Sequence, residues 1–258
     1  MKYTSTLALS SLLILAACGG GGGGGGGSTK TPNQQQNQTP IVIDLDIDAS
    51  IDGQYLAVFE TVNPQITSKI TGAFTFSREK DVDEVVGDVR ITNAGPGLLH
   101  SQNVRLGTRC PTANDDTNAD GIIDAQEGEA VYGGIYFPLD GDLSSQASHD
   151  GEFPVGDVYG NYIWARMTSF TKFISDLRSP KQDDGYFRLA DKEPMDLEGR
   201  VVVIHGVDAA SGLPATVRSV GRFANHQSLP IACGVIGKVL SPPGEVDDGR
   251  YPSEMGDL

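Results

Sequence analysis

The sequence predicts an all-β domain over residues 41–240, a stretch long enough for one hydrophobic core. Two observations predict the fold class. Residues 43–48 alternate isoleucine or leucine with aspartate, and a period of two residues is typical of a strand with one face in water. Further segments rich in Val, Ile, Phe and Tyr are separated by Gly, Pro, Asn or Asp, which favours strands joined by turns. These segments are Tyr55–Val62, Ile70–Ser77, Val85–Thr92, Ala130–Leu139, Arg200–Val207, Ala215–Phe223 and Ala232–Leu240.

One helix is predicted inside this β-rich pattern. Apolar side chains recur at helical spacing at Met167, Phe170, Phe173, Ile174 and Leu177. Thr168 and Ser169 are suitable N-terminal caps, and Pro180 would end the helix. We interpret the aromatic stripe as core packing rather than as a ligand site.

The N-terminus has the pattern of a processing segment. Lys2 gives a short positive start, and Leu7–Ala17 is an apolar run too short to span a membrane. The run ends at Cys18 in Leu-Ala-Ala-Cys, which resembles the lipobox of bacterial lipoproteins. The resemblance implies that residues 1–17 are a signal peptide and that lipid on Cys18 anchors the chain to a membrane. The residue after this cysteine is Gly19 rather than Asp, which in that family favours the outer membrane of the bacterial cell envelope. The alternative is an ordinary secretory signal with a cysteine at this place by chance.

Residues 18–40 and 241–258 have compositions that disfavour folding. Gly19–Gly27 is unbroken glycine, and Ser28–Pro40 is rich in Gln, Asn, Thr and Pro. Such segments bury too little apolar surface to offset the entropy of ordering. We expect residues 18–40 to be a tether and residues 241–258, with Pro242 and Pro243, to be a mobile tail.

The charge of the chain excludes one class of partner. Removing Lys2 with the signal peptide leaves 19 − 1 = 18 basic side chains against 34 acidic ones, a net charge of 18 − 34 = −16. Such a surface repels nucleic acid and anionic headgroups and attracts cations. We therefore expect no nucleic-acid partner.

Two cysteines remain once Cys18 carries lipid, namely Cys110 and Cys233. In an oxidising compartment such a pair usually forms a disulfide. Two separate buried thiols are the alternative.

The sharpest local motif is the segment from Asp116 to Glu127, which matches the twelve-residue calcium loop of an EF-hand. Gly121 stands where the chain must turn sharply, and Ile123 is the apolar residue that attaches such a loop to a core. Calcium prefers six to eight hard oxygen ligands. Asp116, Asn118 and Asp120 would supply side-chain oxygens, and Ile122 would supply its backbone carbonyl. Asp124 would act through water, and Glu127 would bind with both carboxylate oxygens.

The flanks of this loop depart from the EF-hand pattern. Cys110-Pro111-Thr112 is not the end of an ordinary incoming helix, and a predicted strand follows Glu127 closely. We therefore expect a calcium loop without paired helices, holding a structural ion rather than acting as a signalling switch. The alternative is an acidic surface loop that binds nothing.

Several short blocks are similar to copper/zinc superoxide dismutases. They are Gly199–His205, Ala232–Gly237, Gly95–Gly97 with His100, Gly107–Cys110 and Val155–Asp157, and the resemblance that they mark extends over about half of the domain. The resemblance implies a Greek-key β-sandwich in which Cys110 and Cys233 form the disulfide of the family.

The metal ligands of that family are mostly replaced in this chain. Asn103 and Arg105 stand where the family has two copper histidines, and His205 is the copper ligand kept in register. Arginine carries a fixed charge that repels a metal ion. Pro154 replaces a zinc histidine, and Pro230 replaces the arginine that guides the substrate.

These departures favour a non-catalytic binding or structural role over an enzyme. The alternative is a divergent copper dismutase or another metalloenzyme that uses His205, His100 and His226; the fourth histidine is His149. The chain also resembles, more loosely, chordin-type domains, which would imply binding. The sequence does not identify a protein or glycan partner.

Overall fold

The computed structural model describes residues 51–143, 152–179, 187–221 and 223–240. The predicted signal peptide, the tether, the strand at residues 43–48, His149, Pro180 and the tail lie outside the described residues. Among the residues that are described, no helix is long and apolar enough to cross a membrane.

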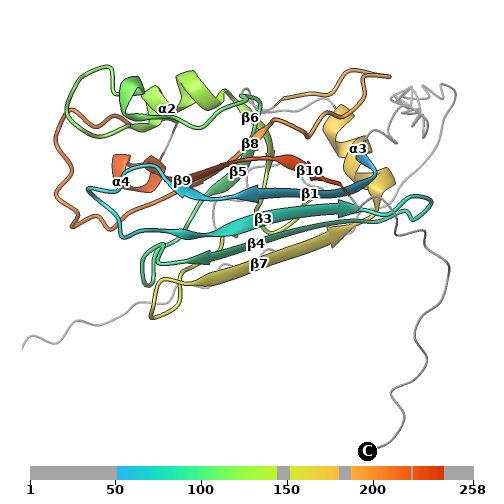
Figure 1. Ribbon diagram of the computed structural model, residues 1–258, viewed down its shortest axis with the longest axis horizontal. Coiled ribbons are helices and arrows are strands. Elements are labelled where there is room, and N and C mark those ends of the chain that lie inside the picture. Colours follow the sequence, from blue (N-terminus) through green and yellow to red (C-terminus); the bar gives the residue numbers. More distant parts are fainter. Residues whose placement is uncertain (1–50, 144–151, 180–186, 222, 241–258) are drawn as a thin grey trace, which may run out of the picture. The chain divides into compact units, whose positions relative to one another are not determined.

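The described residues form two five-stranded antiparallel sheets (Figure 1). The first sheet has the order β10 (Gly237–Val239), β1 (Gly53–Val58), β3 (Thr71–Arg78), β4 (Val85–Thr92) and β7 (Tyr162–Thr168). The second has the order β2 (Glu60–Thr61), β9 (Pro230–Val235), β8 (Val201–His205), β5 (Gln102–Arg105) and β6 (Ile135–Pro138). The all-β prediction is confirmed at this level.

The chain passes between the two sheets several times. It crosses between β4 and β5, between β6 and β7, and between β7 and β8. Two further connections between the sheets are single residues. Phe59 joins β1 to β2, and Ile236 joins β9 to β10. Both side chains are buried, so each connection places an apolar anchor between the sheets.

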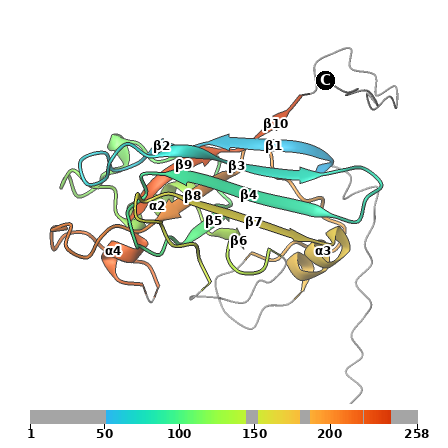
Figure 2. The same cartoon turned by 90° about the horizontal axis from the view of Figure 1, so that it is seen from below.

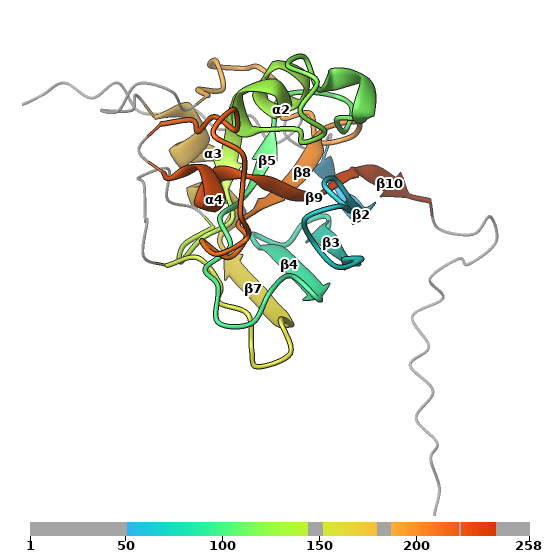
Figure 3. The same cartoon turned by 90° about the vertical axis from the view of Figure 1, so that its left-hand side faces the viewer.

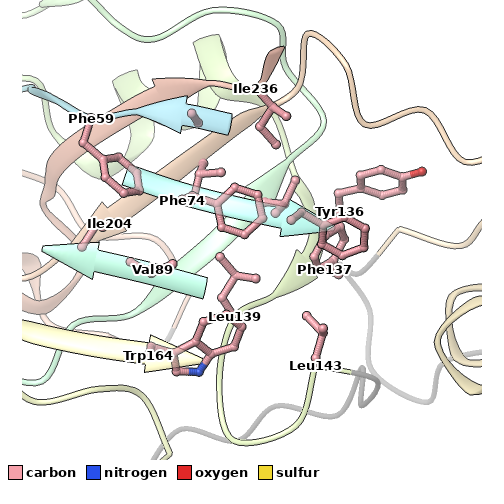
Figure 4. Close-up of a cluster of buried hydrophobic side chains, with 14 of the residues drawn as sticks. Phe59, Phe74, Val89, Tyr136, Phe137, Leu139, Leu143, Trp164, Ile204 and Ile236 are labelled. Atoms are coloured by element: carbon pink, nitrogen blue, oxygen red, sulfur yellow. The ribbon is translucent and has the colours of Figure 1, made fainter. Parts of the chain in front are cut away.

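The main core fills the space between the sheets. In β1, Tyr55 and Ala57 are buried while Leu56 and Val58 are exposed, as a strand with one wet face requires. Apolar side chains of both sheets meet in this layer (Figure 4), among them Phe74, Val89, Trp164, Phe137 and Ile204. Burying such side chains contributes about 1.5–3 kcal/mol each.

The predicted helix is present as α3 (Phe170–Arg178). Ser169 is its N-cap and accepts a hydrogen bond from the Lys172 amide at 3.0 Å. The ring of Phe173 lies 5.8 Å from that of Phe76 and 5.3 Å from that of Phe137, so the aromatic stripe is core packing, as predicted. Figure 2 shows α3 at one end of the first sheet and α4 (Asn225–Ser228) at the other.

Several predicted elements were wrong. Met167 belongs to strand β7 and its side chain is 64% exposed, so it is not part of the helix stripe. The first residues of the predicted strand Ala130–Leu139 are the end of a helix, α2 (Ala125–Tyr132), which means that α3 is not the one inserted helix. The strand expected at Ala215–Phe223 does not form; residues 215–221 make turns and irregular backbone instead. The residue patterns did not predict strands β5 and β7 or helices α2 and α4.

A smaller apolar cluster covers the outer face of the second sheet. Tyr132 of α2 packs there against Val201, Val203 and Cys233, with Cys110 beside them. Figure 3 shows α2 lying over β5 and β8. The segment from Cys110 to Tyr132 is called the covering layer below. The disulfide between Cys110 and Cys233, with Cα atoms 5.7 Å apart, confirms the predicted pairing and ties this covering layer to β9.

Candidate metal centre

The predicted calcium loop runs from Asp116 to Glu127: it begins directly after η2 (Ala113–Asp115), and its last three residues are the first three of α2. The chain has positive φ angles at Ala119, 58°, and at Gly121, 86°. Glycine adopts this left-handed region without a steric penalty, which explains the residue at the predicted sharp turn. Because α2 begins within the loop and continues to Tyr132, the expectation of a loop without paired helices was wrong on the exiting side. The incoming side has only the single turn of η2.

Side chains at the first three ligand positions bind the loop's own backbone. Asp116 accepts hydrogen bonds from the amides of Asp120, at 3.2 Å, and Gly121, at 2.7 Å. Asn118 Oδ1 accepts from the Asp120 amide at 2.9 Å, and Asp120 Oδ1 accepts from the Ile122 amide at 2.9 Å. These bonds hold oxygen-bearing side chains on one short turn.

Glu127 ties the end of the loop to its beginning. Its Oε1 atom accepts hydrogen bonds from the Thr117 amide at 2.9 Å, the Thr117 hydroxyl at 2.8 Å and the Asn118 amide at 3.1 Å. Its Oε2 atom accepts from the Asp124 amide at 3.0 Å, while Asp124 Oδ1 accepts from the Glu127 amide at 2.9 Å. This reciprocal pair is a capping box, which accounts for the start of α2 at this point.

Arg218, from a distant segment of the chain, forms ion pairs with two carboxylates of the loop. Arg218 Nε lies 2.6 Å from Asp124 Oδ2, and Arg218 Nη2 lies 3.2 Å from Glu127 Oε1. The Asp124 and Glu127 side chains are buried, whereas that of Arg218 is 41% exposed. Burial alone would raise the pKa of Asp124, but hydrogen bonds from the Arg218 guanidinium and from the Glu127 and Arg218 amides hold it below its usual value.

The same segment makes further contacts with the loop. The Thr216 hydroxyl donates to Asp120 Oδ2 at 2.5 Å, and the Gln126 side chain donates to the Ser219 carbonyl at 3.2 Å. The Arg218 amide donates to Asp124 Oδ2 at 3.0 Å. This amide bonds to a side chain rather than to a neighbouring strand, which is the physical reason why the strand predicted at Ala215–Phe223 does not form.

Asn63 attaches the loop to the sandwich. Its side-chain amide donates to the Ile123 carbonyl at 3.0 Å and to the Pro230 carbonyl at 2.9 Å, and its Oδ1 atom accepts from the Ile123 amide at 2.9 Å. The pair of bonds to Ile123 reproduces the pairing that a neighbouring strand would make. Ile122 and Ile123 are both buried. Sequence reasoning missed Asn63 and Arg218, because neither residue lies near the motif in the chain.

The donor set fits calcium in its chemistry, since Ile122 offers a backbone carbonyl and the side chain at every other ligand position carries oxygen. As placed, no group of three or more His, Cys, Asp or Glu side chains in the described residues could hold a metal ion. Glu127 binds loop amides and a guanidinium, so it has to rotate before it can take part in such a group.

Of the three histidines in the alternative prediction, His205 packs against Tyr132 of α2. His205 Nδ1 is 3.2 Å from the Ser101 carbonyl oxygen, and its Nε2 is 3.5 Å from the Tyr132 hydroxyl. His100 Nδ1 is 3.1 Å from the His205 carbonyl oxygen. His226 lies on the short helix α4. Both ring nitrogens of His205 thus have partners within the protein.

Arg105 and Asn103 lie near these histidines on the outer side of β5. The guanidinium of Arg105 is 5.0 Å from the centre of the Tyr132 ring, and Asn103 is buried. Burial, together with the charge of Arg105, lowers the pKa of His205 to about 3. Burial also lowers the pKa of His100.

The lowered pKa of His205 predicts a loss of stability in acid. The folded state holds this ring neutral, while the unfolded chain protonates it below its ordinary pKa of about 6.5. The contribution of His205 is therefore complete above about pH 6.5 and falls by about 1.4 kcal/mol per pH unit towards pH 3. Urea unfolding at a series of pH values from 7 to 4 gives the free energy of unfolding at each pH. This free energy should fall less steeply with decreasing pH for His205→Gln than for the wild type or the control His226→Gln. Equal slopes for all three proteins would contradict this assignment.

Neither a comparison with protein-family models nor one with curated proteins finds a match for this chain.

Proposed function

We propose that this chain is an envelope-anchored, calcium-stabilised lipoprotein whose dismutase-like β-sandwich has a non-catalytic binding or structural role. The observation that carries the proposal is the loop from Asp116 to Glu127, with an oxygen ligand at each position that calcium requires. This loop lies in the layer that covers the outer face of the second sheet, next to the disulfide.

Calcium in this loop would link η2 to α2. Asp116, Asn118 and Asp120 would supply side-chain oxygens and Ile122 its carbonyl, while Asp124 would act through water and Glu127 through both carboxylate oxygens. The ion would supply positive charge among four carboxylates, those of Asp116, Asp120, Asp124 and Glu127. Outside the cell, calcium is abundant enough to fill sites with a Kd of about 10⁻⁴ to 10⁻³ M. The proposed location is therefore compatible with even a weak structural site.

Calcium should raise the melting temperature of the mature protein. An ion that binds only the folded state stabilises it by RT ln(1 + [L]/Kd), which is about 2.7 kcal/mol at about a hundredfold excess over Kd. For a domain of this size that corresponds to about 5–10 °C. Thermal melts after chelator treatment, with and without added calcium, measure the effect. Coincident curves for the wild type would contradict the calcium proposal.

Glu127→Gln should reduce this calcium effect more than any other single change in the loop, because it removes one bidentate carboxylate at constant size. The matched control is Glu129→Gln, which removes the same charge from the same helix without touching a ligand position. Magnesium, which demands smaller octahedral geometry, should stabilise less than calcium at equal concentration. Equal shifts with the two ions would argue against the inferred oxygen geometry.

The order of the strands supports a Greek-key sandwich of the dismutase type. Strands β1, β3, β4 and β7 lie side by side in one sheet, while β9, β8, β5 and β6 lie side by side in the other. Connections that leave one sheet and return to it after a pair in the other are the arrangement that Greek-key sandwiches share. The disulfide from the loop segment to β9 adds support, because the resemblance implied that pairing.

The surroundings of His205 support a non-catalytic role. Copper chemistry needs several imidazoles with a free nitrogen that faces a metal. Here both ring nitrogens of His205 have protein partners, and the fixed positive charge of Arg105 lies close enough to lower its pKa. A second cation is unfavourable beside that guanidinium.

Membrane attachment through Cys18 has its own test. Cys18→Ser should abolish lipidation, because the thiol is the attachment point that the lipobox pattern predicts. Expression in a Gram-negative host, followed by membrane fractionation and intact-mass measurement, should find the wild type in the outer membrane with added lipid mass. The variant should keep its precursor mass or appear in the soluble fraction. A variant that stays in the membrane with unchanged mass would contradict the anchor.

A further inference from the structure

We infer that Arg218 sets the calcium affinity of the loop, by acting as an internal cation that the ion must displace from Glu127. This inference rests on the proposed calcium function. It concerns a residue that lies 91 positions after Glu127 in the chain and belongs to no calcium motif.

The geometry places one guanidinium on two ligand positions. Arg218 Nε and Nη2 contact Asp124, at 2.6 and 3.3 Å, and Nη2 also contacts Glu127 at 3.2 Å. The two carboxylates have almost no exposure to water, so their charges need a cation beside them. In the described structure that cation is Arg218.

The arginine contact and the calcium contact exclude each other at Glu127. A bidentate ligand uses both carboxylate oxygens on the ion, whereas Glu127 Oε1 here accepts from Thr117, Asn118 and Arg218. Calcium would also bring a double positive charge close to the guanidinium, and the two would repel each other. Binding calcium therefore requires Arg218 to leave Glu127, and the lost ion pair weakens the observed affinity.

The displacement has a structural consequence beyond the loop. Thr216 and Arg218 connect the segment of residues 213–221 to ligand side chains: Thr216 contacts Asn118 and Asp120, and Arg218 contacts Asp124 and Glu127. When the ion takes Asp120 and Glu127, this segment loses part of its attachment. Residues 213–221 should therefore be held more loosely with calcium than without it.

Calorimetric titration of the full mature lipoprotein in detergent tests the inference, with calcium chloride added after chelator treatment. Arg218→Gln should lower the Kd for calcium by at least about tenfold relative to the wild type. The matched control is Arg109→Gln, which removes the same charge beside the loop, where Arg109 pairs with Asp115 rather than with a ligand. Arg218→Lys, which keeps the charge without the planar fork, should fall between wild type and Arg218→Gln.

Hydrogen exchange gives a second readout that does not depend on affinity. Calcium should speed amide exchange in the peptide that covers residues 213–221 of the wild type. Slower exchange there would show that the segment stays docked, and would overturn the displacement.

The titrations separate this inference from the proposed function. Tighter calcium binding by Arg218→Gln than by Arg109→Gln supports the inference. This comparison holds even where the wild type binds calcium too weakly to measure. Equal affinities for these two variants, in proteins that bind calcium, overturn the inference and leave the calcium function standing. No binding by any of the proteins overturns the calcium function itself.

Discussion

Replacing both bridge cysteines, Cys110→Ser with Cys233→Ser, is expected to lower the free energy of unfolding by about 4–5 kcal/mol. The bridge closes a loop with a sequence separation of 123 residues, and in the chain-entropy model a loop of that length restricts the unfolded state strongly. Cys233 is also fully buried against Val203 and Tyr132, so serine would place an unpaired hydroxyl in an apolar cluster.

Urea unfolding of the oxidised wild type, the reduced wild type and the double variant measures this effect. Reduction alone should cause most of the loss, because it opens the loop without changing the packing of either residue. Each single variant should resemble the double variant, since one cysteine cannot form the bridge. A double variant within about 1 kcal/mol of the oxidised wild type would show that the covering layer holds itself in place without the bridge.

Local sequence patterns predicted the elements whose causes are local. Strand β4 has the predicted bounds, because alternating buried valines and turn residues at both ends decide it. Helix α3 begins where Ser169 caps it and is stabilised by an apolar stripe on one face. The disulfide followed from counting cysteines, and the turn at Gly121 followed from the loop motif.

Some local signals were present but were outweighed by others. Residues 125–132, Ala-Gln-Glu-Gly-Glu-Ala-Val-Tyr, include good helix formers, and Asp124 with Glu127 is the signature of a capping box. The apolar residues around Tyr136 are typical of a strand, so the predicted strand was extended too far towards the N-terminus and included the end of this helix. Likewise, assigning Met167 to the helix stripe concealed the alternation of buried Tyr162 and Trp164 in strand β7.

The remaining features depend on contacts between residues far apart in the sequence. The segment near Ala215 has strand-like composition, yet its Arg218 amide and side chain bind Asp124, which lies 94 positions earlier. The pairing of Asn63 with Ile123 spans 60 positions. Such contacts leave no local periodicity, so a single sequence does not reveal them.

The covering layer explains why the acidic loop and the disulfide occur together. The outer face of the second sheet is apolar at Val201 and Val203, so it needs a cover. The segment from Cys110 to Tyr132 supplies that cover through η2, the acidic loop and α2. The bridge holds its beginning, Tyr132 packs its end, and the loop between them is attached by Asn63 and Arg218.

Asn63→Ala should lower the free energy of unfolding by about 3–4 kcal/mol, a large effect for one polar side chain. Asn63 is almost fully buried, and its removal leaves the Ile123 amide, the Ile123 carbonyl and the Pro230 carbonyl without these partners. Each unsatisfied buried group costs about 1–3 kcal/mol. The matched control is Asn161→Ala, which removes one bond to the more exposed Asn93 amide and should cost less than about 1 kcal/mol.

Because Asn63 fixes the middle of the calcium loop, its loss should also weaken the stabilisation by calcium, whereas Asn161→Ala should leave that stabilisation unchanged. Urea unfolding of both variants, with calcium and with a chelator, measures the two effects together. Equal losses in the two variants would mean that the side-chain pairing with Ile123 does not hold the loop to the sandwich.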